Sequence, residues 1–138
     1  MKIMVSACLL GENCKYSGGN NYCERVIRFV SGHEVISVCP EVLGGLPVPR
    51  PPAEIVDGVV TTRDGVSVDA QFRLGAQKAI ELAKENGVDM VILQPRSPSC
   101  GVRQIYDGSF TGTKISGQGV FAHLLTETGF RVIDADEL

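Results

Sequence analysis

Three of the five cysteines in this 138-residue chain follow apolar runs that have the length of β-strands. Cys8 and Cys39 come directly after such runs, and Cys100 lies in the loop that follows a third. In an open α/β sheet, ligands bind beyond the carboxyl ends of the strands, so we expect these thiols to meet at one edge. Thiolates bind soft metal centres such as zinc and iron–sulfur clusters. The sequence therefore predicts a metal site formed by Cys8, Cys39 and Cys100.

The type of metal centre is left open by the residues alone. Structural zinc usually takes a fourth protein ligand, and neither histidine is well placed, because His33 precedes a predicted strand and His123 lies within a predicted helix. Three cysteines on a four-iron cluster would leave one iron open to a substrate, on which it could act as a Lewis acid. The alternative is that the three cysteines are small buried residues at strand ends.

The two remaining cysteines have no predicted ligand role. Cys23 falls on the apolar face of a predicted helix and is expected in the core. Cys14, in the polar loop 11–21, could approach the site, but nothing requires it to be a ligand. An odd number of cysteines in a chain without a secretory signal argues against a disulfide framework.

Glu41 stands two residues after Cys39, and the intervening Pro40 stiffens the link. A carboxylate beside a metal-bound substrate could activate water as a general base or pass protons to a leaving group. The alternative is a structural role, in which Glu41 caps the backbone or pairs with Arg50.

Two serines precede Cys100 in the segment SPSCG. Ser97 and Ser99 could bind a substrate by hydrogen bonds or transfer a proton, but serines in turns more often bond to the local backbone. No GxSxG motif supports a serine nucleophile.

The elements expected to position these residues alternate between strand and helix. The apolar runs are near-continuous, as in a parallel sheet covered on both faces, and the helical patterns end at glycines. The predicted strands are 3–7, 34–38, 89–93 and 131–135, and the predicted helices are 21–32, 69–86 (with Asp69 as the N-cap) and 117–129. We predict one α/β domain over residues 1–138, a three-layer Rossmann-like fold whose four parallel strands have the order 2-1-3-4.

Two segments fall outside this alternation. Asp57-Gly58 separates two short β-prone runs and predicts a small β-hairpin insertion. Residues 106–119 are rich in glycine and hydroxyl groups and could hold an anion before the last helix, although flexible turns are the simpler interpretation.

Charge and hydropathy exclude several classes of partner. The net charge is −3 and no basic block is present, which argues against strong nucleic-acid binding. No apolar stretch approaches the ~20 residues that span a bilayer, and no signal peptide is evident, so a cytoplasmic protein without membrane association is predicted. The sequence does not indicate an oligomeric state.

Four long motifs give the chain a family resemblance. They are SACLLGENCKYSGGNN, VCPEVLGGLPVPRPPAEI, SPSCG with IYDGSFTG, and GQGVFAHLL. Together they span nearly the whole chain and resemble the family once classified as domain of unknown function 523 (DUF523), which includes the thiouracil desulfidases.

This resemblance implies a [4Fe–4S] cluster held by Cys8, Cys39 and Cys100. The free iron would bind the sulfur of a thiolated uracil-type base or nucleoside, and the C–S bond would be cleaved hydrolytically without net electron transfer. Glu41 would handle water and Ser97 protons as catalytic residues. The position of Ser99 in the same turn, and not the resemblance, predicts that it binds the substrate. Two other functions stay open: an iron–sulfur or sulfide storage or transfer protein, and a thiol redox protein.

Overall fold

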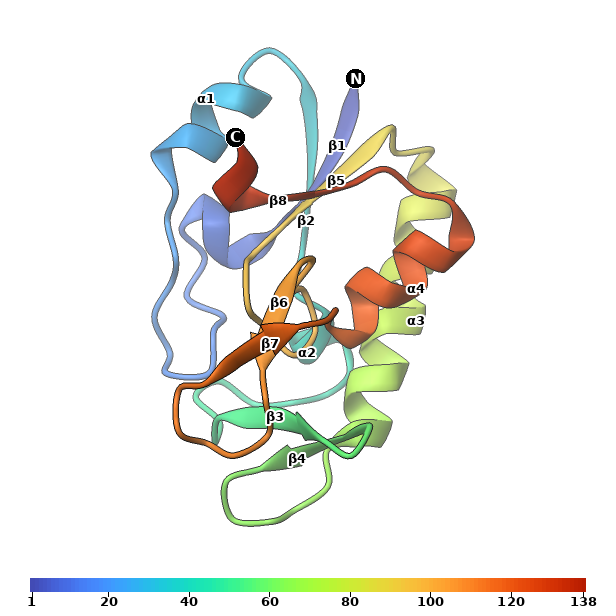
Figure 1. Ribbon diagram of the computed structural model, residues 1–138. Coiled ribbons are helices and arrows are strands. Elements are labelled where there is room, and N and C mark those ends of the chain that lie inside the picture. Colours follow the sequence, from blue (N-terminus) through green and yellow to red (C-terminus); the bar gives the residue numbers. More distant parts are fainter.

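A four-stranded parallel sheet forms the centre of the computed structural model, which describes residues 1–138 (Figure 1). Its order is β2-β1-β5-β8, which confirms the predicted order 2-1-3-4. In the register of the sheet, Val5 pairs with Ser37 on one side and with Ile92 on the other. The strands are β1 (Lys2–Ser6), β2 (Glu34–Val38), β5 (Met90–Leu93) and β8 (Val132–Asp134).

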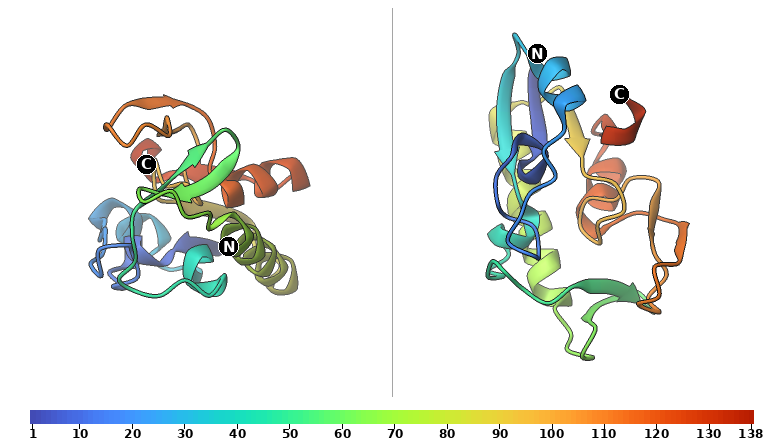
Figure 2. Two further views of the ribbon diagram at one scale, coloured as in Figure 1. Left: turned by 90° about the horizontal axis from the view of Figure 1, so that it is seen from below. Right: turned by 90° about the vertical axis from the view of Figure 1, so that its left-hand side faces the viewer.

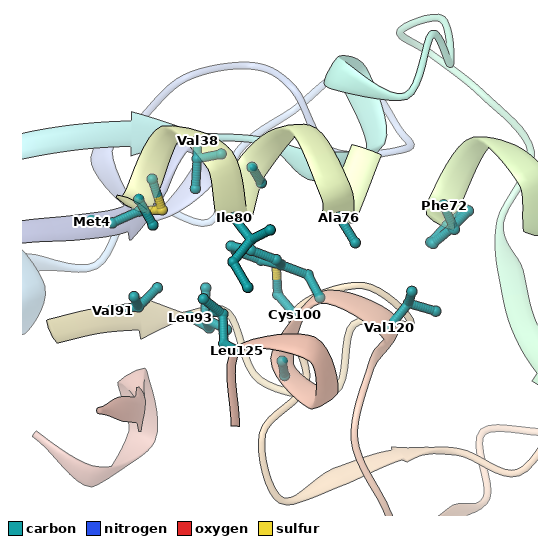
Figure 3. Packing of buried hydrophobic residues seen from close by; sticks show 14 of the residues in the cluster. Met4, Val38, Phe72, Ala76, Ile80, Val91, Leu93, Cys100, Val120 and Leu125 are labelled. Atoms are coloured by element: carbon teal, nitrogen blue, oxygen red, sulfur yellow. The ribbon is translucent and has the colours of Figure 1, made fainter. Parts of the chain in front are cut away.

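Helices cover both faces of this sheet, as predicted for a three-layer fold. Because strand side chains alternate between faces, Met4 packs beneath α3 (Asp69–Asn86) and α4 (Val120–Thr128), in the cluster that Figure 3 shows. Ile3 and Val5 point to the other face, where they pack with α1 (Glu24–Val30) and the short helix η1 (Ala7–Leu10).

The start of α3 differs from the prediction by one residue. Val68, not Asp69, is the N-cap. The Asp69 carboxylate instead accepts the N–H of Val60 at 3.0 Å and the Nε–H of Arg73 at 3.3 Å. Asp69 therefore connects the helix to the neighbouring hairpin. The helix ends, as predicted, at Gly87, whose φ of +59° is left-handed.

Two β-hairpins lie beyond the carboxyl end of the sheet, and Figure 2 (left) looks onto this end. The hairpin of β3 (Ala53–Val56) and β4 (Val59–Thr62) was predicted, and its turn residues Asp57 and Gly58 have φ of +49° and +81°, as the Asp-Gly signal requires. The second pairs β6 (Gln104–Tyr106) with β7 (Lys114–Ser116). It replaces the flexible turns expected in residues 106–119.

A short helix, α2 (Pro40–Leu43), was not predicted and holds the segment that follows β2. Two glycines let α2 approach α3 backbone to backbone. A Cβ atom on Gly75 would lie 1.8 Å from the Pro40 carbonyl oxygen, and one on Gly44 would lie 2.0 Å from the Gln71 carbonyl oxygen. This contact fixes Cys39 and Glu41, which flank Pro40.

The chain also contains the short C-terminal helix η2 (Ala135–Glu137). None of the helices combines the length and the apolar character that crossing a bilayer demands.

Candidate active site

The carboxyl ends of three neighbouring strands bring Cys8, Cys39 and Cys100 to one cavity of about 470 Å³. Cys8 lies in η1 directly after β1, Cys39 caps α2 directly after β2, and Cys100 lies in the loop after β5. The strand order reverses between β1 and β5, the position at which α/β folds bind ligands. The structure thus brings the three predicted thiols together.

The geometry does not suit a single metal ion. No three His, Cys, Asp or Glu side chains converge closely enough to hold one. His33 pairs with the N-terminus, and His123 pairs with Glu127 on the surface of α4. Three thiols that line one cavity from three strand ends form a donor set of the kind that iron–sulfur clusters use.

Burial acts on the thiols unequally. It raises the pKa of Cys100 to about 12 and also raises the pKa of Cys8. The hydrogen bond from the Cys14 thiol lowers the pKa of Cys39 to about 7, and the same bond raises the pKa of Cys14. A coordinated metal deprotonates a thiol outright, so binding of a metal centre would overcome the effect of burial at Cys8 and Cys100.

Each of the three sulfur atoms has a neutral hydrogen-bond partner. Asn21 Nδ2 donates to Cys8 Sγ at 3.5 Å, and Lys15 Nζ in turn donates to Asn21 Oδ1 at 3.3 Å. The Ser99 hydroxyl oxygen lies 3.6 Å from Cys100 Sγ, and the Cys39 thiol donates to the Cys14 carbonyl oxygen at 3.9 Å. Such partners orient metal ligands and tune the metal.

Glu41 faces the same cavity. Its carboxylate pairs with Arg50, which was the structural role considered for it above. Arg50 Nε donates to Glu41 Oε1 at 3.0 Å, and the Arg50 side chain is only 4% exposed. The guanidinium also donates to the carbonyl oxygens of Pro47 at 3.2 Å and Cys14 at 2.9 Å. One buried arginine therefore connects three segments of the cavity wall.

The other carboxylate oxygen of Glu41 is held by Ser99. The Ser99 hydroxyl donates to Glu41 Oε2 at 2.7 Å and lies 2.9 Å from the Ser97 hydroxyl oxygen. Since a hydroxyl has one hydrogen, the Ser97 hydroxyl is the donor of the second bond. The result is a hydrogen-bonded row that runs from Ser97 through Ser99 to Glu41.

Ser97 also makes the local backbone bonds that the alternative interpretation anticipated. Its Oγ accepts the N–H groups of Ser99 at 3.1 Å and Cys100 at 3.0 Å. The carbonyl oxygen of Ser99 accepts the N–H groups of Phe121 at 2.8 Å and Ala122 at 3.1 Å at the start of α4. These bonds satisfy backbone donors that a helix N-terminus leaves free, and they hold the loop rigidly.

Cys23 lies apart from this site. It is the N-cap of α1 and is partly buried against the hydrophobic cluster between α1 and the sheet. It lines a separate cavity. Its expected packing role is consistent with this position.

Sequence reasoning did not identify Asn21, Lys15 and Arg50 as site residues. Asn21 and Lys15 belong to an irregular loop without periodicity, and Arg50 follows a proline-rich segment whose path depends on tertiary contacts. Arg50 was named only as a partner of Glu41. The one available signal was their position within the long motifs.

Comparisons with known proteins show the family of the chain. The family model described as 2-thiouracil desulfurase matches residues 3–137. A Bacillus subtilis (strain 168) protein named YbbK and described as uncharacterized is 41% identical over 146 residues, covering 99% of this chain and 97% of that protein. The solved structure of TudS, described as a [4Fe-4S]-dependent thiouracil desulfidase, is 40% identical and superposes with a TM-score of 0.93, covering 99% of this chain and 92% of TudS.

Proposed function

Because the chain belongs to the 2-thiouracil desulfurase family, we propose that it is a [4Fe–4S]-dependent desulfidase that converts thiouracil to uracil and sulfide. The observation that carries this proposal is the similarity to TudS over 99% of the chain. The convergence of three thiols on one cavity supports it independently. The activity and cofactor are those that the family resemblance implied.

Cys8, Cys39 and Cys100 are the residues that would hold the cluster. The donor set fits, because three thiols from three strand ends line one cavity without converging on one ion. When bound, the cluster supplies an iron without a protein ligand, a Lewis acid for the sulfur of the substrate.

Glu41 is proposed as the general base that takes a proton from water. Arg50 on Oε1 and Ser99 on Oε2 fix the orientation of the carboxylate. Each carboxylate oxygen has a further lone pair available, so the group can still accept a bond from water. Attack of that water on the ring carbon replaces C=S by C=O, and no electrons are exchanged with an external donor. This hydrolytic course is the finer part of the proposal.

The two serines have different proposed roles. Ser97 is half-buried at the cavity and is proposed to orient the substrate ring or donate a proton to it. The binding of substrate by Ser99 stays a prediction. Its side chain is buried and its hydrogen is directed to Glu41, which favours a positioning role that acts through the carboxylate.

The test is anaerobic incubation of the cluster-loaded protein with 2-thiouracil, 4-thiouracil or 4-thiouridine, without a reductant. We expect sulfide release and formation of the oxo base. In water labelled with ¹⁸O, the label should appear in the new carbonyl group. Absence of turnover with all three compounds would favour the storage or transfer function, and an unlabelled carbonyl would exclude hydrolysis by bulk water.

A further inference from the structure

A fourth cysteine lies at the cavity and is not needed as a cluster ligand. Cys14 is half-buried in the loop between η1 and α1, and it lines the cavity together with Cys39. The two thiols are within hydrogen-bonding distance of each other, and Cys39 Sγ lies 3.9 Å from the Cys14 carbonyl oxygen.

The backbone of Cys14 is held at this position by the buried Arg50. Arg50 Nη2 donates to the Cys14 carbonyl oxygen at 2.9 Å while Nε holds Glu41. Glu41 and Cys39 lie at the same end of α2. Arg50 therefore ties the backbone of Cys14 to the segment that carries Cys39, and this keeps the two sulfur atoms adjacent. The proximity of the thiols is therefore built into the fold.

The remaining cysteines are poorer partners for Cys39. Cys100 is 4% exposed and packs against the hydrophobic cluster between the sheet, α3 and α4 (Figure 3), so it is the least accessible of these thiols. Cys23 lines a different cavity. Cys8 faces the shared cavity, but its sulfur is bonded to Asn21.

We propose that Cys14 and Cys39 form a reversible disulfide in the cluster-free protein. This rests on the proposed function, because it takes Cys39 to be a cluster ligand. Cluster and disulfide then compete for one sulfur atom, and the protein holds either one or the other. Cys14 protects the ligand from irreversible oxidation to the sulfinic acid while no cluster is bound.

A small disulfide such as oxidised glutathione is the oxidant. The Cys39 thiolate attacks one of its sulfur atoms, forms a mixed disulfide and releases one glutathione thiolate. The Cys14 sulfur then attacks the Cys39 sulfur, gives up its proton and releases the second glutathione as a thiol. Two protein thiols lose two electrons and two protons, and one oxidised glutathione becomes two molecules of glutathione. Both thiols are partly exposed and line the cavity.

The experiment starts from the cluster-loaded full chain, treated with an iron chelator and oxidised glutathione and then digested without reduction. We expect one cross-linked peptide pair that joins Cys14 to Cys39, and the loss of two of the five free thiols. Protein in this state should take up no new cluster from iron and sulfide until dithiothreitol is added. Without the chelator, the cross-link should be absent.

Two variants sharpen the test. Cys14→Ser should load the cluster, but after the same treatment it should carry a glutathione adduct on Cys39 and no internal cross-link. Cys23→Ser should behave like the wild type. A cross-link between Cys39 and Cys8, no cross-link, or equal cross-linking with the cluster in place would overturn the proposal. Peptide mapping does not require thiouracil, so its result is independent of whether the protein catalyses desulfuration.

Discussion

Ser99 and Glu41 lie 58 residues apart in the chain, yet their side chains share a hydrogen bond of 2.7 Å at the cavity. The bond links the loop after β5 to the first turn of α2. It also gives the carboxylate a second fixed partner, opposite Arg50. The orientation of the proposed base thus depends on segments that follow two different strands.

Ser99→Ala should slow desulfuration by about ten- to a hundredfold, because a hydrogen bond to a charged group contributes about 1.5–3 kcal/mol. We expect kcat to fall while the iron content and KM stay near their wild-type values. Steady-state kinetics on cluster-loaded protein, with iron analysis of the same samples, would measure this. Ser109→Ala, at an exposed loop position, is the control. A rise in KM with kcat unchanged would instead favour direct contact between Ser99 and the substrate.

Glu41→Gln should retain the cluster and lose activity by about a hundredfold or more, since a carboxamide cannot accept the proton of water. The variant leaves the buried Arg50 without its carboxylate, so the unfolding midpoint should be measured in parallel. A folded, cluster-loaded variant with normal turnover would show that Glu41 is not the base.

Replacing Cys8, Cys39 or Cys100 by serine should abolish the brown colour of anaerobically prepared protein. The wild type should contain about four irons per chain after full reconstitution. Cys23→Ser is the matched control, because Cys23 lies at a separate cavity and should leave the visible spectrum unchanged. Stoichiometric zinc in place of iron would contradict the assignment.

Asn21→Ala should lower the reduction potential of the cluster, because it removes a hydrogen-bond donor from Cys8 Sγ and leaves more electron density on the sulfur. A potentiometric titration followed by electron paramagnetic resonance would measure the shift. Asn20→Ala removes a neighbouring amide that bonds to Asn13 on the surface, and it should leave the potential unchanged. Equal potentials in Asn21→Ala and the wild type would exclude this role.

Gly75→Ala should destabilise the protein by about 1–3 kcal/mol and impair cluster loading, because the new Cβ would collide with the Pro40 carbonyl group. The collision displaces α2, which carries Glu41 and begins at Cys39. Chemical unfolding and the iron content would report the two effects. Lys78→Ala, on the exposed side of the same helix, should change neither.

The sheet and the meeting of the three thiols could be predicted because apolar strands of a parallel sheet are recognisable from local sequence and their ends share one edge. The short α2 could not be predicted, because the contacts of Gly44 and Gly75 that hold it join distant segments. The strands β6 and β7 have three residues each, too few for a period-2 signal. For Glu41, the sequence left open a catalytic role or a structural role such as pairing with Arg50. Only the path of the loop between the two residues shows that their side chains meet.

Cys8 and Cys100 belong to the hydrophobic clusters on opposite faces of the sheet. A group bound to both residues is therefore thermodynamically linked to both halves of the core, and its binding free energy adds to the free energy of unfolding. Iron starvation would then act on this protein in two ways. It would remove the catalyst, and it would lower the melting temperature of the protein, which would make the cluster-free chain a better substrate for cellular proteases.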